Sequence, residues 1–133
     1  MRVLVVEDDP VLASGLRAGL RMQGATLDIV ENCADGRAAL AASEFDALVL
    51  DLMLPDGSGL DLLPAIGDTP AIVLTGSGSE RVAAKALRLG AGDYLVKDPA
   101  RNYLGKLPEV VEGLIARRSP GRRELREHLS ALE

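Results

Sequence analysis

Five short apolar runs recur along the chain, and segments with helical spacing of apolar residues separate them. The runs are Val3–Val6, Thr26–Val30, Ala47–Leu50, Ala71–Leu74 and Tyr94–Val96. The third and fourth are uninterrupted, as expected for strands that are buried on both faces of a parallel sheet. The second alternates and carries Asp28, so its strand signal is weaker. Strands that alternate with helices predict an α/β fold with a doubly wound five-stranded parallel sheet.

Capping residues and prolines mark the expected helices. Asp9 is the expected N-cap of a helix that starts at Pro10 and is ended by Gly24. Further helices are expected at Asp35–Ser43, from Ser58 onward, from Ser79 to Gly90, and at about Pro108–Arg117. Pro64 lies inside the helix that Ser58 opens. An interior proline costs about 3 kcal/mol, so this helix should be short, kinked or shifted.

Polar residues follow four of the predicted strands. Glu7 and Asp8 end the first strand, Asp51 the third, Thr75 the fourth and Lys97 the fifth. Taken alone, Asp51 could cap a turn and Lys97 could be an exposed charge. Because the carboxyl ends of parallel strands meet at one edge of the sheet, we expect all five groups in one cleft.

The chemistry of this cleft follows from its donors. Carboxylate oxygens suit Mg²⁺, which binds through one or two carboxylates together with waters and phosphate oxygens. A cation beside Asp51 would offset the repulsion between its carboxylate and an incoming phosphoryl group. Thr75 and Lys97 could then hold phosphoryl oxygens.

Composition narrows the class of protein. The 133 residues suit one domain, and the net charge of −5 argues against binding to a nucleic-acid backbone. One cysteine, Cys33, cannot form an internal disulfide, which fits a reducing cytoplasm. No signal peptide or membrane span is recognisable, and His128 is expected to be solvated.

Four segments resemble the receiver domains of two-component response regulators. Val5–Asp9 resembles the acidic-pair motif and Leu48–Gly57 the phosphoacceptor motif. Val73–Thr75 resembles the switch-hydroxyl strand and Asp93–Lys97 the lysine strand. The resemblance covers Val3 to about Ile115, nearly the whole chain. It implies a CheY-like, flavodoxin-like (βα)5 fold with strand order 2-1-3-4-5.

The resemblance also implies a role for each site residue. Asp51 would be the phosphoacceptor, assisted by Thr75 and Lys97, and Thr75 and Tyr94 would be the switch residues. The Mg²⁺ ligands it implies are Glu7, Asp8, Asp51 and the backbone carbonyl of Met53. A sensor histidine kinase or phosphotransfer protein would donate the phosphoryl group. The chain would not be an enzyme beyond its own phosphorylation and dephosphorylation.

One departure from the family pattern follows the lysine. Receivers usually have a proline there, after a cis peptide bond, but here Asp98 intervenes and Pro99 comes one residue later. We therefore expect a differently shaped loop and no cis bond. The Lys97–Asp98 pair resembles receivers attached to sensory or kinase modules. The break at Pro108 puts the usual dimer face in question, and homodimerisation is left open.

The domain organisation expected from the sequence is a receiver at residues 1–118 and a linker or amphipathic tail at 119–133. The tail suggests a piece of a longer protein with a sensory, kinase or output module, although a single-domain regulator is left open. No direct contact with nucleic acid or membrane is expected.

Three other classes of protein share part of this pattern. A Mg²⁺-dependent phosphatase of the haloacid dehalogenase type would need a second Asp where Met53 stands. A nucleotide-binding module would need a glycine-rich loop after the first strand, where acids stand instead. A non-phosphorylated interaction domain on the receiver fold is the remaining alternative, and the retained site residues argue against it.

Overall fold

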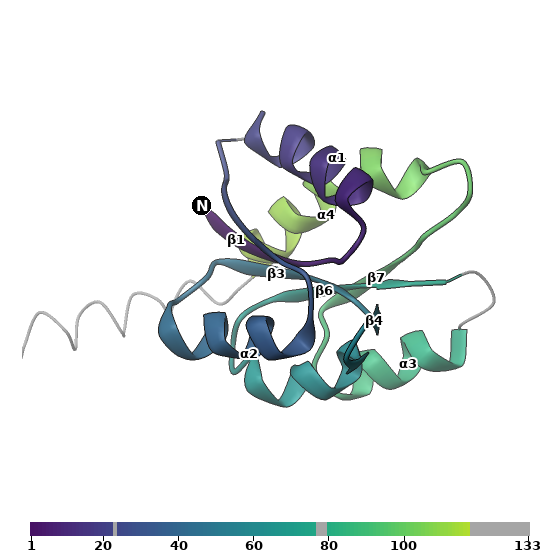
Figure 1. The fold of residues 1–133 in the computed structure, drawn as a ribbon. Helices are drawn as coiled ribbons and strands as arrows, with labels where there is room; N and C mark the ends of the chain where they lie inside the picture. Colours follow the sequence, from purple (N-terminus) through teal and green to yellow (C-terminus); the bar gives the residue numbers. More distant parts are fainter. Residues whose placement is uncertain (23, 77–79, 118–133) are drawn as a thin grey trace, which may run out of the picture.

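The computed structural model describes residues 1–22, 24–76 and 80–117, and its centre is a five-stranded parallel sheet (Figure 1). In chain order the strands are β1 (Arg2–Val6), β2 (Thr26–Val30), β3 (Ala47–Asp51), β6 (Ala71–Thr75) and β7 (Asp93–Val96). Their order across the sheet is β2-β1-β3-β6-β7, and every neighbouring pair is parallel. Counted along the chain, this is the predicted order 2-1-3-4-5, which confirms the doubly wound, flavodoxin-like fold.

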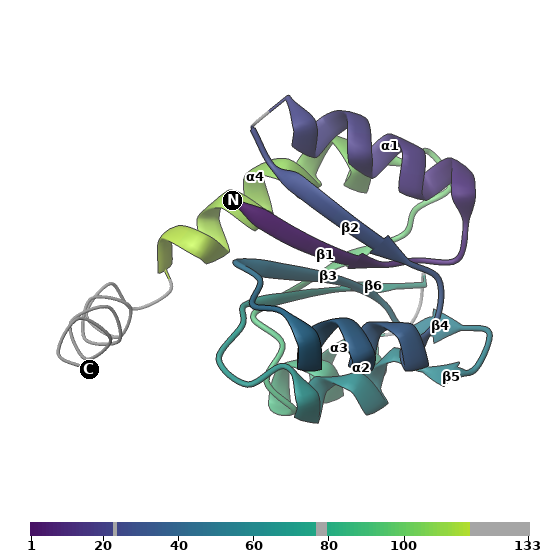
Figure 2. The same ribbon diagram turned by 60° about the vertical axis from the view of Figure 1, so that its left-hand side comes forward.

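Helices cover both faces of the sheet, as Figures 1 and 2 show from two directions. One face carries α1 (Pro10–Arg21) and α4 (Asn102–Arg117), and the other carries α2 (Cys33–Ala42), the 3-10 helix η1 (Gly59–Ala65) and α3 (Glu80–Arg88). Each face has its own apolar core. In β3, Val49 packs in the α1–α4 core, whereas Leu48 and Leu50 pack in the other. The uninterrupted apolar pattern of this strand therefore reflects burial on both sides.

A short hairpin lies beyond the end of β3. It pairs β4 (Met53–Leu54) with β5 (Gly57–Ser58) in antiparallel register, and the Pro-Asp-Gly sequence at 55–57 favours the turn between them. Ser58 then caps η1, since its Oγ accepts a hydrogen bond from the Leu60 backbone N–H at 3.2 Å. The structure confirms the shortened helix expected from Pro64, in the form of a 3-10 helix.

The predicted start of the last helix is wrong by six residues. α4 begins at Asn102 and contains Pro108 in its interior, whereas the sequence pattern placed Pro108 in the first turn. The contacts of Asp98 explain the earlier start. Its carboxylate accepts hydrogen bonds from the N–H groups of Asn102 and Tyr103, and the Pro108 ring lies beside Gly19 of α1, where even a Cβ would make an ordinary contact at 3.4 Å.

Other boundaries shift by less. α2 begins at Cys33 rather than Asp35, because Asn32 is its N-cap and accepts from the Asp35 N–H at 2.8 Å. Asp9 caps α1 as predicted, and Gly24 follows that helix with a left-handed φ of 77°. The expected cap at Ser79, the tail at 119–133 and His128 lie outside the described residues.

The peptide bond after Lys97 has the geometry that the sequence predicts. All peptide bonds in the described ranges are trans, including the one that joins Lys97 to Asp98. Among the helices of those ranges, none has the length and apolar character that crossing a membrane requires.

Candidate functional site

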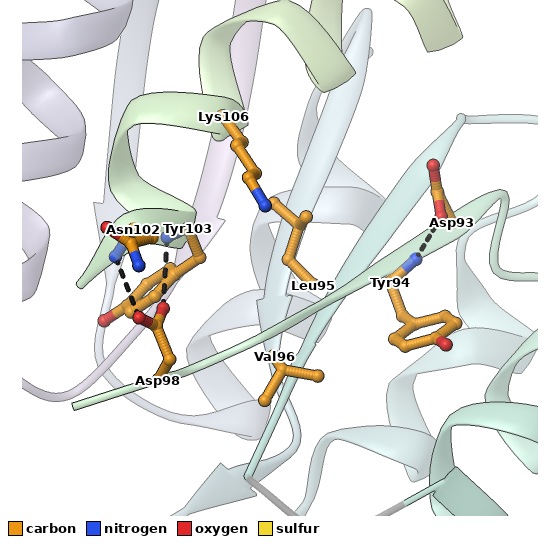
Figure 3. A pocket seen from close by; sticks show the side chains of 8 residues that line it. All are labelled: Asp93, Tyr94, Leu95, Val96, Asp98, Asn102, Tyr103 and Lys106. Carbon is orange, nitrogen blue, oxygen red and sulfur yellow. Dashed lines mark hydrogen bonds between the residues drawn. The ribbon is translucent and has the colours of Figure 1, made fainter. Parts of the chain in front are cut away.

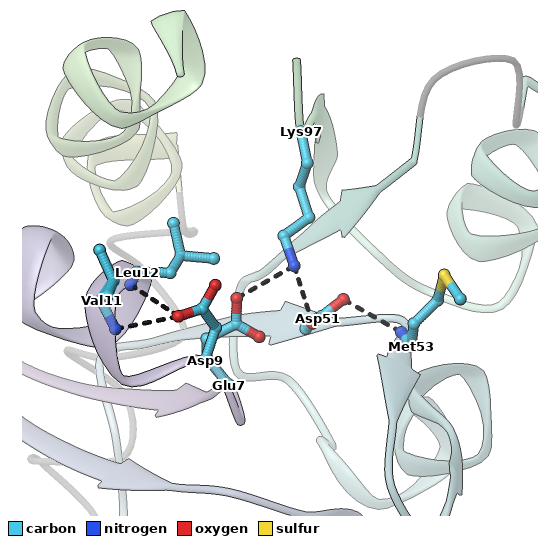
Figure 4. Close-up of polar contacts among 7 residues, drawn as sticks. All are labelled: Glu7, Asp9, Val11, Leu12, Asp51, Met53 and Lys97. Atoms are coloured by element: carbon cyan, nitrogen blue, oxygen red, sulfur yellow. Dashed lines mark hydrogen bonds and ion pairs between the residues drawn. The ribbon is translucent and has the colours of Figure 1, made fainter. Parts of the chain in front are cut away.

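Asp51 lies at the carboxyl end of the central strand and is almost fully buried, with 2% of its surface exposed. Both of its carboxylate oxygens have defined partners (Figure 4). Oδ1 accepts a hydrogen bond from the Met53 backbone N–H at 3.0 Å, and Oδ2 accepts one from Lys97 Nζ at 2.9 Å. The first contact is local, which agrees with a turn role for Asp51. The second joins residues that are 46 positions apart, so a turn cap alone does not describe this aspartate.

Lys97 reaches the site from the edge of the sheet. It follows β7, and its backbone N–H donates to the Thr75 carbonyl oxygen at 2.7 Å, which continues the strand pairing. Its side chain extends toward β3, where Nζ also lies 3.0 Å from Glu7 Oε1. Burial disfavours the ammonium, but the hydrogen bonds to Asp51 and Glu7 outweigh this effect and raise the pKa of Lys97 above 10.5. Lys97 is therefore paired with two acids and is not a free strand-end charge.

Glu7 is a buried acid beside these two groups. Only 1% of its surface is exposed; its Oε1 has the Lys97 ammonium 3.0 Å away, whereas its Oε2 has no hydrogen-bond partner within the described part of the chain. Burial and the neighbouring Asp51 raise the pKa of Glu7 to about 8, against the opposing effect of Lys97. Burial acts on Asp51 in the same sense, but hydrogen bonds with Glu7, the Met53 amide and Lys97 prevail and lower its pKa. The pair thus favours a charged Asp51 beside a protonated Glu7.

The acids at this edge have the arrangement of a cation site. Glu7, Asp8 and Asp51 each offer one oxygen, and these oxygens all lie within 4.8 Å of one another. Glu7 is a second sign, because among the described residues its buried carboxylate has one cationic partner, Lys97 Nζ, for two oxygens, and buried polar atoms normally are satisfied. Hard oxygen donors of this kind fit Mg²⁺. Asp9 is not part of the group, since its Oδ1 accepts from the Val11 N–H at 2.9 Å as the cap of α1 (Figure 4).

Thr75 lies on the neighbouring strand, one residue beyond the position that pairs with Asp51. In the sheet register Asp51 is opposite Leu74, so Thr75 is the next residue toward the carboxyl edge. It is buried, and its Oγ1 has no hydrogen-bond partner among the described residues. Leaving a buried hydroxyl unsatisfied costs about 1–3 kcal/mol, so this group is suited to receive an incoming acceptor.

Tyr94 lies on β7 at the outer edge of the sheet, with 37% of its surface exposed. Its backbone N–H donates to Asp93 Oδ1 at 2.8 Å. Figure 3 shows the pocket that this residue lines together with residues of β7 and the start of α4. Tyr94 is therefore partly exposed, and its role as a switch stays a prediction.

Two residues near Asp51 have roles that the sequence did not reveal. A Cβ on Gly59 would lie 2.3 Å from the Asp51 backbone oxygen, so only glycine allows the hairpin to pack against the end of β3. Asp56 accepts hydrogen bonds from the N–H groups of Cys33 and Ala34 at 2.8 and 3.0 Å. In the sequence, Asp56 looks like an ordinary turn residue between Pro55 and Gly57. Neither role has a local signal, because each depends on segments that meet in the fold.

The fold and site together define a class: a doubly wound α/β domain with an acidic, lysine-bearing site at the carboxyl edge of its sheet. The family model of the response regulator receiver domain matches residues 3–107, and the chain belongs to that family. The family consists of signalling domains.

Curated relatives agree with this assignment. The chain is 43% identical to the response regulator protein PmrA of Pseudomonas aeruginosa over 101 residues, which cover 73% of this chain and 46% of PmrA. It is 40% identical over 99 residues to the acid tolerance regulatory protein ActR of Rhizobium meliloti, covering 71% of this chain and 51% of ActR. The chain thus spans about half the length of these relatives.

Solved structures agree as well. A CheY-like response regulator receiver domain protein from Methanospirillum hungatei JF-1 is similar, with a TM-score of 0.72 and 27% identity, over 85% of this chain and 94% of that one. The receiver domain of a signal transduction histidine kinase from Syntrophus aciditrophicus has a TM-score of 0.75 and 26% identity, over 89% of this chain and 93% of that one.

Proposed function

We propose that this chain takes a phosphoryl group onto Asp51 from a histidine kinase or a phosphotransfer protein, in a Mg²⁺-dependent reaction, and thereby switches a partner-binding surface. The observation that carries the proposal is the placement of Asp51. Its carboxylate is held by Lys97 Nζ at 2.9 Å, and the buried, unpartnered hydroxyl of Thr75 lies at the end of the adjacent strand.

The chain's own residues supply most of the chemistry. The lowered pKa of Asp51 keeps its carboxylate charged, as a nucleophile must be. One Asp51 oxygen forms a bond to phosphorus, while the bond from phosphorus to the donor's nitrogen or acyl oxygen breaks and its electron pair leaves with the donor. The Lys97 ammonium and the Thr75 hydroxyl are positioned to hold phosphoryl oxygens, which restrains the transferred group and offsets its charge.

The acidic group is proposed to hold Mg²⁺. Its ligands would be Glu7, Asp8, Asp51 and the backbone carbonyl of Met53. A bound Mg²⁺ supplies positive charge to the phosphoryl oxygens. Glu7 would lose its proton when it becomes a ligand, because a nearby cation favours the carboxylate.

Tyr94 is proposed to be the residue whose change of rotamer alters the partner-binding surface. If Thr75 moved toward a phosphoryl group on Asp51, space would open beside β6, and Tyr94 could turn from its exposed rotamer into that space. This would change the surface formed by α3, β7 and α4, where a partner would bind. A homodimer would be one such partner, and the phosphoryl group would act by shifting the populations of two states.

The context of the domain is also a proposal. Some relatives are named transcriptional regulatory proteins, including QseB of Haemophilus influenzae, and the chain covers 54% of that protein. We propose that the receiver at 1–118 acts with a sensory, kinase or output module, and that 119–133 serves as a linker or tail. The net charge of −5 supports a domain that does not itself bind nucleic acid. The cytoplasmic location expected from the sequence stays a prediction.

Intact-mass spectrometry with acetyl phosphate tests the phosphoacceptor. The wild-type chain should gain the mass of one phosphoryl group when Mg²⁺ is present, and the gain should disappear with a chelator. Asp51→Asn should abolish it, because the amide is a poor nucleophile. Asp56→Asn is the matched control, since Asp56 is an aspartate of the same loop that contacts α2 instead of the cleft. Labelling of Asp51→Asn at the wild-type level would refute the assignment.

A further inference from the structure

The turn between β7 and α4 is organised around Asp98, the residue that departs from the family pattern. Its backbone N–H donates to the Val96 carbonyl oxygen at 2.9 Å, and its own carbonyl accepts from the Arg101 N–H at 2.9 Å. Its carboxylate receives the N–H groups of Asn102 and Tyr103, each at 3.2 Å (Figure 3). Asp98 therefore connects the end of the edge strand to the first turn of the last helix.

The backbone of this turn is strained at Arg101, the residue just before the two N–H groups that Asp98 accepts from. Arg101 has a φ of 60° and is the one non-glycine residue with positive φ in the described ranges. A left-handed conformation costs a non-glycine residue about 1–3 kcal/mol and persists where surrounding contacts enforce it. The two carboxylate hydrogen bonds satisfy N–H groups that have no partner inside the helix, so they supply such contacts.

Asp98 is linked to the phosphoacceptor site through the preceding residue, Lys97. Its neighbour Lys97 places Nζ 2.9 Å from Asp51 Oδ2, and the Lys97 backbone N–H bonds to Thr75. A shift of the Lys97 backbone must therefore move Asp98. Because the Asp98 carboxylate accepts hydrogen bonds from the first N–H groups of α4, the same shift would also move the backbone of Asn102 and Tyr103.

The start of α4 can tilt relative to the rest of the helix, because Pro108 interrupts the hydrogen bonding between the two parts. Pro108 has no N–H, so the helical hydrogen bond at that position is missing, and prolines are common points of helix bending. Residues before this point, including Asn102, Tyr103 and Lys106, line the open pocket beside β7, whose volume is about 520 Å³. A small tilt of this turn would change the shape of the pocket.

We propose that Asp98 is a positioning residue that couples the occupant of Asp51 to the first turn of α4, and through it to the pocket beside β7. The inference rests on the proposed function, and it says how a phosphoryl group on Asp51 would change the surface beside β7. Where a proline would set the shape of the loop by itself, Asp98 transmits the position of Lys97 through two hydrogen bonds. Coupling of this kind is reciprocal, so a change in the turn also changes binding at Asp51.

Amide NMR spectra of the 133-residue chain, recorded with and without beryllofluoride and Mg²⁺, test the coupling. Resonances of Leu52 and Met53 report occupancy of Asp51, and those of Asn102, Tyr103 and Lys106 report the first turn. In the wild type both groups should shift on loading. In Asp98→Ala the first group should shift as before, and the shifts of the second should fall to less than half.

Asp93→Ala is the matched control. Asp93 lines the same pocket, but its carboxylate accepts only from Tyr94 of its own strand among the contacts described, so both groups should still shift. Asp98→Asn keeps one carbonyl acceptor and should give an intermediate result. If Asp98→Ala does not fold, Asp98→Asn takes its place in the comparison with the wild type.

The outcomes separate this inference from the proposed function. A purely structural cap would alter the α4 resonances of Asp98→Ala in both states and leave the loading-induced change at wild-type size, which would overturn the coupling. Wild-type spectra in which Leu52 and Met53 shift but the first turn does not would also overturn it, while the phosphoacceptor would stand. Absence of any shift at Leu52 and Met53 would overturn both.

Discussion

The backbone N–H of Cys33 donates a hydrogen bond to Asp56 Oδ1 at 2.8 Å, although the two residues are 23 positions apart in the chain. Asp56 Oδ2 accepts from the next N–H, that of Ala34, and Asn32 accepts from the N–H of Asp35. The start of α2 is thus satisfied partly from its own N-cap and partly from the hairpin that follows Asp51. This contact anchors that hairpin to a helix on the same side of the sheet.

The Asp56 contact predicts a pH dependence of stability. The hydrogen bonds from Cys33 and Ala34 lower the pKa of Asp56 below 3.8 in the folded chain. A carboxyl group with a lowered folded pKa stabilises the fold above its unfolded pKa of about 3.9, and the contribution is lost as the pH falls through the folded value. Asp56→Asn should therefore be less stable than the wild type from pH 5 to 7, and the difference should shrink below about pH 4.

Urea unfolding of both proteins across this pH range measures the difference. Glu31→Gln, which removes an exposed acid two residues before Cys33, is the control for the loss of one negative charge. An Asp56→Asn difference that did not diminish in acid would show that the charge of Asp56 has no part in holding the hairpin.

Asp8 and Asp9 are adjacent acids with different predicted roles. The Asp8 carboxylate lies with those of Glu7 and Asp51, whereas Asp9 caps α1. Asp8→Ala should weaken Mg²⁺ binding roughly tenfold or more, about 1.4 kcal/mol. Asp9→Ala should leave that affinity nearly unchanged and lower the free energy of unfolding by about 1 kcal/mol, the usual cost of losing an N-cap.

Calorimetric Mg²⁺ titration and thermal melts of the two variants separate these effects, and each variant is the other's control. If both variants lost Mg²⁺ affinity equally, the acidic pair would be displaced by one residue from its assignment here.

Gly59 should be intolerant of any side chain. The Cβ of an alanine there would lie 2.3 Å from the Asp51 backbone oxygen and 3.0 Å from the Leu52 Cα, and these backbone atoms cannot move without moving the end of β3. We expect Gly59→Ala to lower the free energy of unfolding by about 1–3 kcal/mol or more, as for other overpacked sites. Because Asp51 ends that strand, labelling by acetyl phosphate should also slow.

Gly113→Ala is the matched control in α4. A Cβ there meets no atom within 4 Å, and alanine is favoured over glycine in a helix by about 1 kcal/mol. This variant should be as stable as the wild type or more so, with unchanged labelling. Equal stability of Gly59→Ala and the wild type in urea unfolding would mean that the hairpin can move away from β3 at little cost.

The sequence by itself determined the sheet and the membership of most of the site. Uninterrupted apolar runs such as Ala71–Leu74 are a local signal, and the rules for parallel connections then place the ends of the strands at one edge. Glu7, Asp51 and Lys97 could therefore be expected at one edge from their positions along the chain, and the structure brings carboxyl oxygens of Glu7 and Asp51 within 3.0 Å of Lys97 Nζ.

Only the tertiary structure decided what depends on contacts between distant segments. The start of α4 was misplaced because its first N–H groups bond to Asp98 across the left-handed turn at Arg101, a conformation that the sequence pattern does not signal. The raised pKa of Glu7 comes from burial, which a sequence does not state. Gly59 resembles any loop glycine until the Asp51 carbonyl is seen beside it. Periodicity and capping are properties of neighbouring residues, whereas close approach and desolvation arise only when the chain has folded.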